Sequence, residues 1–132
     1  MEYKSSKRYI YSCKYHIIFC PKYRAKVLKD GVDDRSKEII IGLQDGWFKI
    51  IEMEVMPDHV HLMVDASIYK SPIDIVKHIK QQTAVILRRE FLSLKTKIPN
   101  LWTRSAFISS VGTISMDTAK DYIKNQKNRQ HQ

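Results

Sequence analysis

The chain has 132 residues and is 43% hydrophobic, which suits one domain over residues 1–132 and excludes a disordered chain. Two cysteines are too few for a disulfide framework, and neither a membrane helix of about 20 apolar residues nor a signal-peptide core is evident, so we expect a reduced, cytoplasmic protein with no membrane contact. Lys and Arg number 23 against 14 Asp and Glu; this net charge of +9 favours nucleic acid as a partner, with a merely solvated basic surface as the alternative.

The first predicted elements are a strand and a helix. Residues Arg8–Arg24 are rich in Tyr, Ile and Phe, which predicts one long strand that ends near Pro21. Apolar residues then recur at helical spacing: Ile39, Ile40, Leu43 and Trp47. Asp33 or Asp34 is the expected N-cap of this helix, and Gly46 is its expected end.

A β-hairpin is predicted next. Phe48–Met56 and His59–Ser67 both alternate between apolar and polar residues at period two. Only Pro57 and Asp58 separate them, which is the spacing of a tight turn between two antiparallel strands.

The second half of the chain predicts a helix, a strand and a final helix. Ser71 as N-cap and Pro72 at the first helical position begin a helix that runs to Leu94. Its expected apolar positions are Ile75, Ile79, Val85 and Leu87. Residues 105–113 predict a strand and residues 115–132 a polar helix. The order βαββαβ followed by α predicts an α+β, ferredoxin-like antiparallel sheet with helices on one face and an extra C-terminal helix.

Two histidines stand out within the hairpin. His59 and His61 are two residues apart in a strand, so they project from the same face about 7 Å apart, a spacing that suits two ligands of one metal ion. Val60 and Leu62 then face the core. From the pair alone, a metal or catalytic site and a pair of surface histidines remain equally open. We expect His16 to be an ungrouped core or surface residue.

The last helix carries a second candidate pair. Tyr122 and Gln126 are four residues apart and share one helix face. The alternative is a polar helix with a tyrosine packed at its edge. In combination with the histidines, however, an ion held by two imidazoles and one amide oxygen keeps open positions for a phosphate, and the Tyr122 hydroxyl could attack the phosphorus.

Four sequence blocks resemble one family, the single-tyrosine HUH transposases of the insertion sequence two hundred type. The blocks are YHIIFCPKYR, MPDHVHLMV, LWTRSAFISSVG and YIKNQ, and they occur in the family's order between Tyr9 and Gln126. The resemblance implies a ferredoxin-like sheet with a C-terminal helix that carries the nucleophile. It also implies that His59 and His61 bind the metal, that Gln126 is the third ligand, and that Tyr122 is the nucleophile.

The resemblance further implies an activity and partners. Such enzymes cut single-stranded DNA at the ends of their element, form a 5′-phosphotyrosine with a free 3′-OH, and rejoin strands. The expected ion is Mg²⁺ or Mn²⁺, although imidazole ligands alone would favour a softer metal. The expected partners are single-stranded DNA with a subterminal hairpin and a second copy of the chain, in a homodimer with composite active sites.

DNA contacts are expected from the domain itself, because only six residues follow Gln126. The candidates are Lys4, Lys7, Arg8, Lys22, Arg24, Lys80, Arg88, Arg89 and Arg104. For each, a solvated surface position is the alternative. We expect Trp102 to be a core or loop anchor.

Three other functions fit part of the pattern. A non-catalytic nucleic-acid-binding module would explain the charge and the fold, but not the joint occurrence of HxH and YxxxQ. A domesticated relative that cleaves hairpin repeats would share every site residue. A zinc hydrolase would need another strong ligand, for which Asp58 is the nearest candidate, although a turn position favours a structural role for Asp58.

Overall fold

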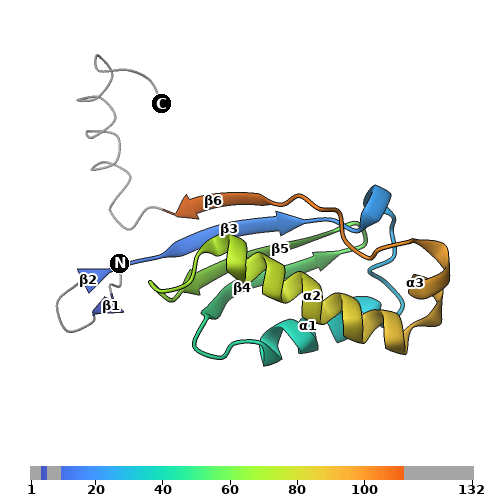
Figure 1. The fold of residues 1–132 in the computed structure, drawn as a ribbon, viewed down its shortest axis with the longest axis horizontal. Coiled ribbons are helices and arrows are strands. Elements are labelled where there is room, and N and C mark those ends of the chain that lie inside the picture. The colour runs from blue at the N-terminus through green and yellow to red at the C-terminus, as the bar shows by residue number, and fades with distance from the viewer. Residues whose placement is uncertain (1–3, 6–9, 112–132) are drawn as a thin grey trace, which may run out of the picture.

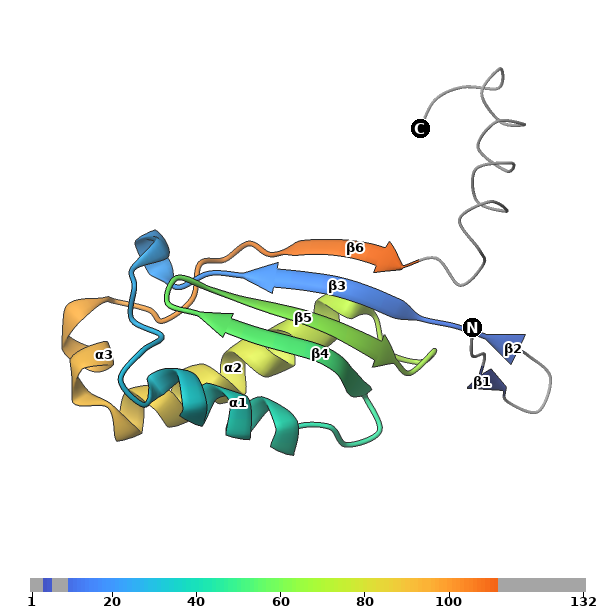
Figure 2. The ribbon, with the colours of Figure 1, turned by 180° about the vertical axis from the view of Figure 1, so that it is seen from behind.

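The computed structural model describes residues 4–5 and 10–111 and contains a four-stranded antiparallel sheet in the order β4–β5–β3–β6. The strands are β3 (Lys14–Phe19), β4 (Phe48–Met56), β5 (His59–Ala66) and β6 (Phe107–Val111). Helices α1 (Val32–Gly42) and α2 (Pro72–Glu90) lie on one face of this sheet, and the described helices leave the other face open (Figures 1 and 2). This is the predicted α+β, ferredoxin-like arrangement. The predicted C-terminal helix lies outside the described residues.

The alternation along β5 determines which residues enter the core. Val60, Leu62, Val64 and Ala66 are all fully buried under the helices. The intervening residues, among them His59 and His61, are half-buried on the open face, as predicted. The core continues into β3 through Ile17 and Phe19.

The N-terminal segment does not form the single long strand that its composition predicts. Strand β2 (Ile10–Tyr11) pairs with β1 (Lys4–Ser5) in a separate two-stranded sheet. Strand β3 begins at Lys14 and pairs with β5 and β6, so the chain changes sheets between β2 and β3. After Pro21 the chain forms a short 3₁₀ helix, η1 (Lys22–Arg24).

Helix α1 begins and ends earlier than predicted. Gly31, with φ of 96°, is its N-cap, because the carbonyl of Gly31 accepts the first helical hydrogen bond from the N–H of Arg35. Asp33 and Asp34 lie inside the first turn, where their charge favours the helix dipole without capping. Gly46 lies beyond the helix, in the turn that leads to β4, with φ of 76°.

The predicted helix from Ser71 to Leu94 is two helices. Its start is confirmed: Ser71 is the N-cap, and its hydroxyl oxygen accepts a hydrogen bond of 3.0 Å from the N–H of Asp74. Helix α2 ends at Glu90, and after an extended residue, Phe91, helix α3 (Leu92–Lys97) follows. No described helix is long and apolar enough to cross a membrane.

Trp102 anchors the segment before β6 to the core, as predicted. Its indole N–H donates a 2.9 Å hydrogen bond to the Thr83 hydroxyl, which is itself fully buried on α2. The indole also packs edge-on against Phe19, with ring centroids 4.7 Å apart. Val85, by contrast, was expected in the core but is 56% exposed, because it lies on the outer side of α2.

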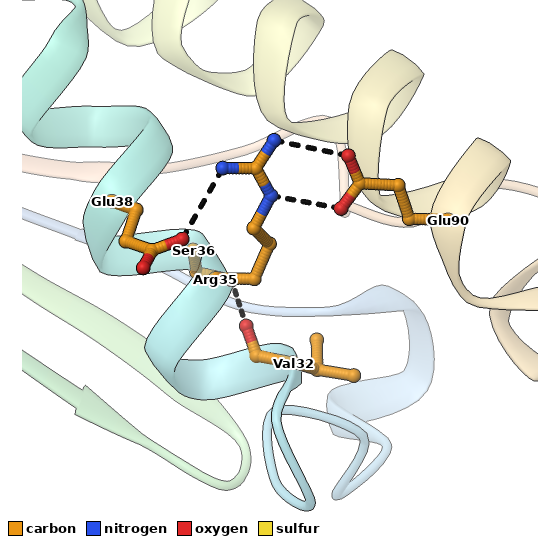
Figure 3. Close-up of polar contacts among 5 residues, drawn as sticks. All are labelled: Val32, Arg35, Ser36, Glu38 and Glu90. Carbon is orange, nitrogen blue, oxygen red and sulfur yellow. Dashed lines mark hydrogen bonds and ion pairs between the residues drawn. The ribbon is translucent and has the colours of Figure 1, made fainter.

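An ion-pair network joins α1 to α2 at the surface (Figure 3). The Arg35 guanidinium donates two hydrogen bonds to the Glu90 carboxylate, of 2.8 and 3.0 Å, and one of 3.2 Å to Glu38. These bonds from Arg35 lower the pKa of Glu90 below its ordinary value. The same contacts raise the pKa of Arg35.

The substitution Glu90→Gln is therefore expected to reduce the free energy of unfolding in a pH-dependent way. A lowered carboxyl pKa stabilises the folded state above the unfolded value of about 4.3 and loses this effect as pH falls through the folded-state pKa. The difference from wild type, measured by urea unfolding at pH values on both sides of the unfolded-state pKa, should be constant well above about 4.3 and should shrink as pH falls below it. Glu38→Gln removes one hydrogen bond to Arg35, whereas Glu90→Gln disturbs two, so Glu38→Gln should reduce the free energy of unfolding by a smaller amount. A difference that is constant over the whole pH range would contradict this electrostatic origin.

Candidate active site

The candidate site is built on the open face of β5. His59 and His61 both project from this face, because the alternate residues Val60 and Leu62 are buried beneath the helices. The neighbouring strand β4 places Met56 opposite His59 and Glu54 opposite His61. The prediction that the two imidazoles project from the same face of the strand is therefore confirmed.

The turn residue Asp58 holds the ring of His59. The Nδ1 atom of His59 lies 2.9 Å from the Asp58 carboxylate, whose second oxygen accepts a 3.0 Å hydrogen bond from Arg24. The pKa of Asp58 is lowered, chiefly by the hydrogen bond with His59 and further by the charge of Arg24. Asp58 thus acts within the hairpin turn as an acceptor, and the Nε2 atom of His59 is left for another partner.

His16 lies beside His61, contrary to our expectation that it is ungrouped. The Nδ1 atom of His16 is 3.2 Å from the Nε2 atom of His61, and the two rings meet edge to edge, with centroids 5.4 Å apart and planes inclined by 26°. Period-two alternation around the buried Ile17 could have assigned His16 to the open face. Its partner could not be found that way, because the pairing of β3 with β5 is a long-range contact.

The two predicted ligands do not complete a metal site by themselves. Among the residues that the structure describes, no group of three or more His, Cys, Asp or Glu side chains is arranged to hold a metal ion. A pair of imidazoles fits an ion that takes its remaining ligands from elsewhere. Tyr122 and Gln126 lie outside the described residues.

A basic groove of about 960 Å³ lies between α2, α3 and the segment before β6. Its basic lining residues are Lys22, Lys80, Arg88, Arg89, Lys95 and Arg104, all of which except Lys95 are predicted DNA contacts. Exposed Val85 and buried Trp102 contribute apolar lining. This basic groove is on the helix side of the sheet, away from the histidines on the open face.

Two of these basic side chains are engaged within the protein. Lys80 donates hydrogen bonds of 2.9 and 2.7 Å to the carbonyls of Thr103 and Ser105, and burial lowers its pKa. Arg88 donates to the carbonyls of Leu94, within α3, and Ile98, the residue that follows α3. Lys22, Arg89, Lys95 and Arg104 make no side-chain hydrogen bond or ion pair within the described part of the chain.

The other predicted DNA contacts are elsewhere. Arg24 is paired with Asp58 beside His59, although its side chain remains 69% exposed. Lys4 forms an ion pair of 2.8 Å with Asp65 at the end of β5. Lys7 and Arg8 lie outside the described residues.

Residues 9–126 match the family described as "Transposase IS200 like". The chain belongs to this family. It is 37% identical over 134 residues to the ISDra2 transposase TnpA of Deinococcus radiodurans. The matched region covers 98% of this chain and 95% of that protein. It is 33% identical over 122 residues to the transposase of the insertion sequence element IS200 of Salmonella typhimurium, covering 88% of this chain and 78% of that one.

Two solved structures share the transposase fold. A crystal structure described as a transposase from Deinococcus radiodurans R1 superimposes with a TM-score of 0.76 and 35% identity, over 93% of this chain and 97% of the other. The structure of a REP-associated tyrosine transposase bound to a REP hairpin gives a TM-score of 0.58 over 95% of this chain and 74% of the other, at 16% identity, and so shares the fold. The family resemblance seen in the sequence is confirmed.

Proposed function

We propose that this IS200-like transposase cleaves and rejoins single-stranded DNA at the ends of its insertion sequence through a 5′-phosphotyrosine on Tyr122. The observation that supports this most directly is the His59–His61 pair on the open face of the sheet, with each ring held by a protein partner. The family match adds support, because it extends through Tyr122 and Gln126.

In the proposed reaction the Tyr122 hydroxyl oxygen attacks the scissile phosphorus. The new phosphotyrosine bond forms as the bond from phosphorus to the 3′ oxygen breaks; the Tyr122 hydroxyl loses its proton, and the 3′ oxygen takes one to become a free 3′-OH. The phosphodiester energy is kept in the covalent link. A 3′-OH from another strand can then attack the same phosphorus, restore the Tyr122 hydroxyl and join the strands.

His59, His61 and Gln126 would hold the ion, Mg²⁺ or Mn²⁺. Such an ion supplies polarisation of the phosphodiester and offsets the charge that develops at phosphorus. The chain's own contribution in the described residues is to orient the ligands: Asp58 holds the ring of His59, and Arg24 in turn holds Asp58. Asp58 is already engaged in this way, so it is a poor candidate for the additional ligand of a zinc hydrolase.

The proposed substrate is a DNA single strand with a subterminal hairpin, bound by a homodimer with composite sites. The basic groove supports the hairpin part of this proposal, because a duplex stem presents closely spaced phosphates that Lys and Arg side chains contact. Recognition on the helix side would leave the open face, with the histidines, for the strand that is cut.

The groove leads to a prediction about salt dependence. Arg89→Ala or Arg104→Ala is expected to weaken hairpin DNA binding irrespective of sequence. Each substitution should also make the slope of log affinity against log salt shallower by about one, the amount expected for the loss of one phosphate contact. Lys77→Ala is the matched control, because Lys77 is an exposed residue of α2 that does not line the groove. Equal slopes for Arg89→Ala, Lys77→Ala and wild type, from fluorescence anisotropy titrations, would exclude the groove as the DNA contact.

The proposed chemistry is tested with a doubly labelled substrate. Single-stranded oligonucleotides from the DNA that flanks the coding sequence would carry one dye at the 5′ end and another at the 3′ end, with Mg²⁺ or Mn²⁺ present. On a denaturing gel, the 3′ dye should migrate with the protein and the 5′ dye with a shortened strand that a polymerase can extend. Tight binding without either product would favour a non-catalytic binding module and overturn the proposal.

A further inference from the structure

We propose that His16 is a positioning residue that fixes the ring of His61, as Asp58 fixes the ring of His59. This inference rests on the proposed function, since it concerns the same centre. It assigns a role to a third histidine that the ion-binding pair does not include.

The sheet register brings His16 and His61 together. Strand β3 runs antiparallel to β5, with His16 opposite Met63 and Ile18 opposite His61, so the two histidines are diagonal neighbours on the open face. Both side chains are half-buried. The distance of 3.2 Å between Nδ1 of His16 and Nε2 of His61 is that of a hydrogen bond, which holds one proton between two nitrogens.

The proton belongs to His61 if that ring is to bind an ion. When the Nε2–H of His61 donates to Nδ1 of His16, the lone pair on Nδ1 of His61 is left available. On His59 it is Nδ1 that is hydrogen-bonded within the protein, to Asp58, so the nitrogen available to an ion is Nε2. Each candidate ligand thus has one nitrogen held by the protein, which is how neighbouring groups set the tautomer of metal-binding histidines.

His16 is better placed for this role than for that of a third ligand. The described residues contain no set of three or more His, Cys, Asp or Glu side chains arranged around one ion, although all three histidines are among them. The two rings are inclined by only 26° and meet edge to edge through these nitrogens, so the hydrogen bond also resists rotation of the His61 ring out of that plane. His16 therefore acts on the ion through His61.

The test uses substitutions that separate the Nδ1 contact from ring packing. His16→Phe keeps the ring and removes the acceptor, whereas His16→Asn places an amide oxygen near the position of Nδ1. His78→Phe is the matched control, because His78 is also a half-buried histidine whose ring lies against another ring, that of Trp47. The readouts are Mn²⁺ affinity without DNA, by electron paramagnetic resonance, and the His61 tautomer in metal-free protein, by long-range ¹⁵N spectra of the ring nitrogens.

His16→Phe is expected to weaken Mn²⁺ binding by about 10- to 100-fold. His16→Asn should recover most of that loss, and His78→Phe should bind Mn²⁺ like wild type. In the wild-type protein His61 should be the Nε2–H tautomer, and His16→Phe should abolish that preference.

Unchanged or tighter Mn²⁺ binding in His16→Phe, or an Nδ1–H tautomer of His61 in wild type, would overturn the role of His16. Both readouts are independent of strand cleavage. Failure of the labelled-strand experiment with a normal His61 tautomer and normal Mn²⁺ binding would therefore reject the proposed function and retain the role of His16.

Discussion

Tyr122→Phe is expected to abolish the covalent protein–DNA adduct and to slow single-strand cleavage by at least about a thousand-fold, with DNA affinity unchanged. The substitution removes one oxygen, the atom proposed to bond to phosphorus, and keeps the aromatic ring. The adduct is measured on a denaturing gel, and affinity is measured by anisotropy with the same oligonucleotide.

A second tyrosine provides the control for this prediction. Tyr69 is 81% exposed in the loop between β5 and α2, so Tyr69→Phe should leave cleavage and adduct formation at the wild-type level. A persistent adduct in Tyr122→Phe would mean that another residue is the nucleophile. An adduct lost equally in Tyr69→Phe would mean that the assay reports something other than the Tyr122 hydroxyl.

His59→Ala and His61→Ala are each expected to reduce cleavage roughly a thousand-fold. An ion at a phosphoryl centre supplies several kcal/mol of transition-state stabilisation, and each 1.36 kcal/mol corresponds to a factor of ten in rate. Removal of either imidazole leaves one described ligand for the ion. The loss should be accompanied by weaker Mn²⁺ binding, and both are measured in parallel across a Mn²⁺ titration.

The fold should survive these two substitutions, which makes the result interpretable. Both histidines are half-buried on the open face, whereas the core residues of β5 face the helices. Met63→Ala is the control, because Met63 is the next half-buried residue on the same face of β5. Cleavage by His59→Ala or His61→Ala within a few-fold of the Met63→Ala rate would contradict an ion held by this pair.

Some features of this protein are determined by local sequence, and these were predicted correctly. The alternation in β5 requires Val60 and Leu62 to be buried, so His59 and His61 must share the opposite face. The start of α2 at Ser71 depends on a side chain and a backbone N–H only three residues apart. The site residues Tyr122 and Gln126 came from helical spacing and the family's motif, and they remain predictions because they lie outside the described residues.

Other local patterns were overridden by packing. The residues from Arg8 onward favour a strand throughout, but two different sheets compete for them, and β2 and β3 separate. The apolar spacing that predicted a buried Val85 is correct for Ile79 and Leu87 on the same helix, which are buried. Val85 lies on the side of α2 that the sheet does not cover. Helical periodicity identifies an apolar face without showing how wide a stripe the rest of the molecule will bury.

By itself, the sequence determined the class of fold, the family and the face that carries the two histidines, because periodicity, capping and motif order are properties of neighbouring residues. Only the tertiary structure decided that His16 meets His61, that Arg24 secures Asp58, and that Lys22, Arg89 and Arg104 border one groove. These contacts join residues from 16 to 104, and they depend on the order β4–β5–β3–β6 and on how α2 and α3 pack. Long-range pairing is set by the burial of the whole core, which no local pattern encodes.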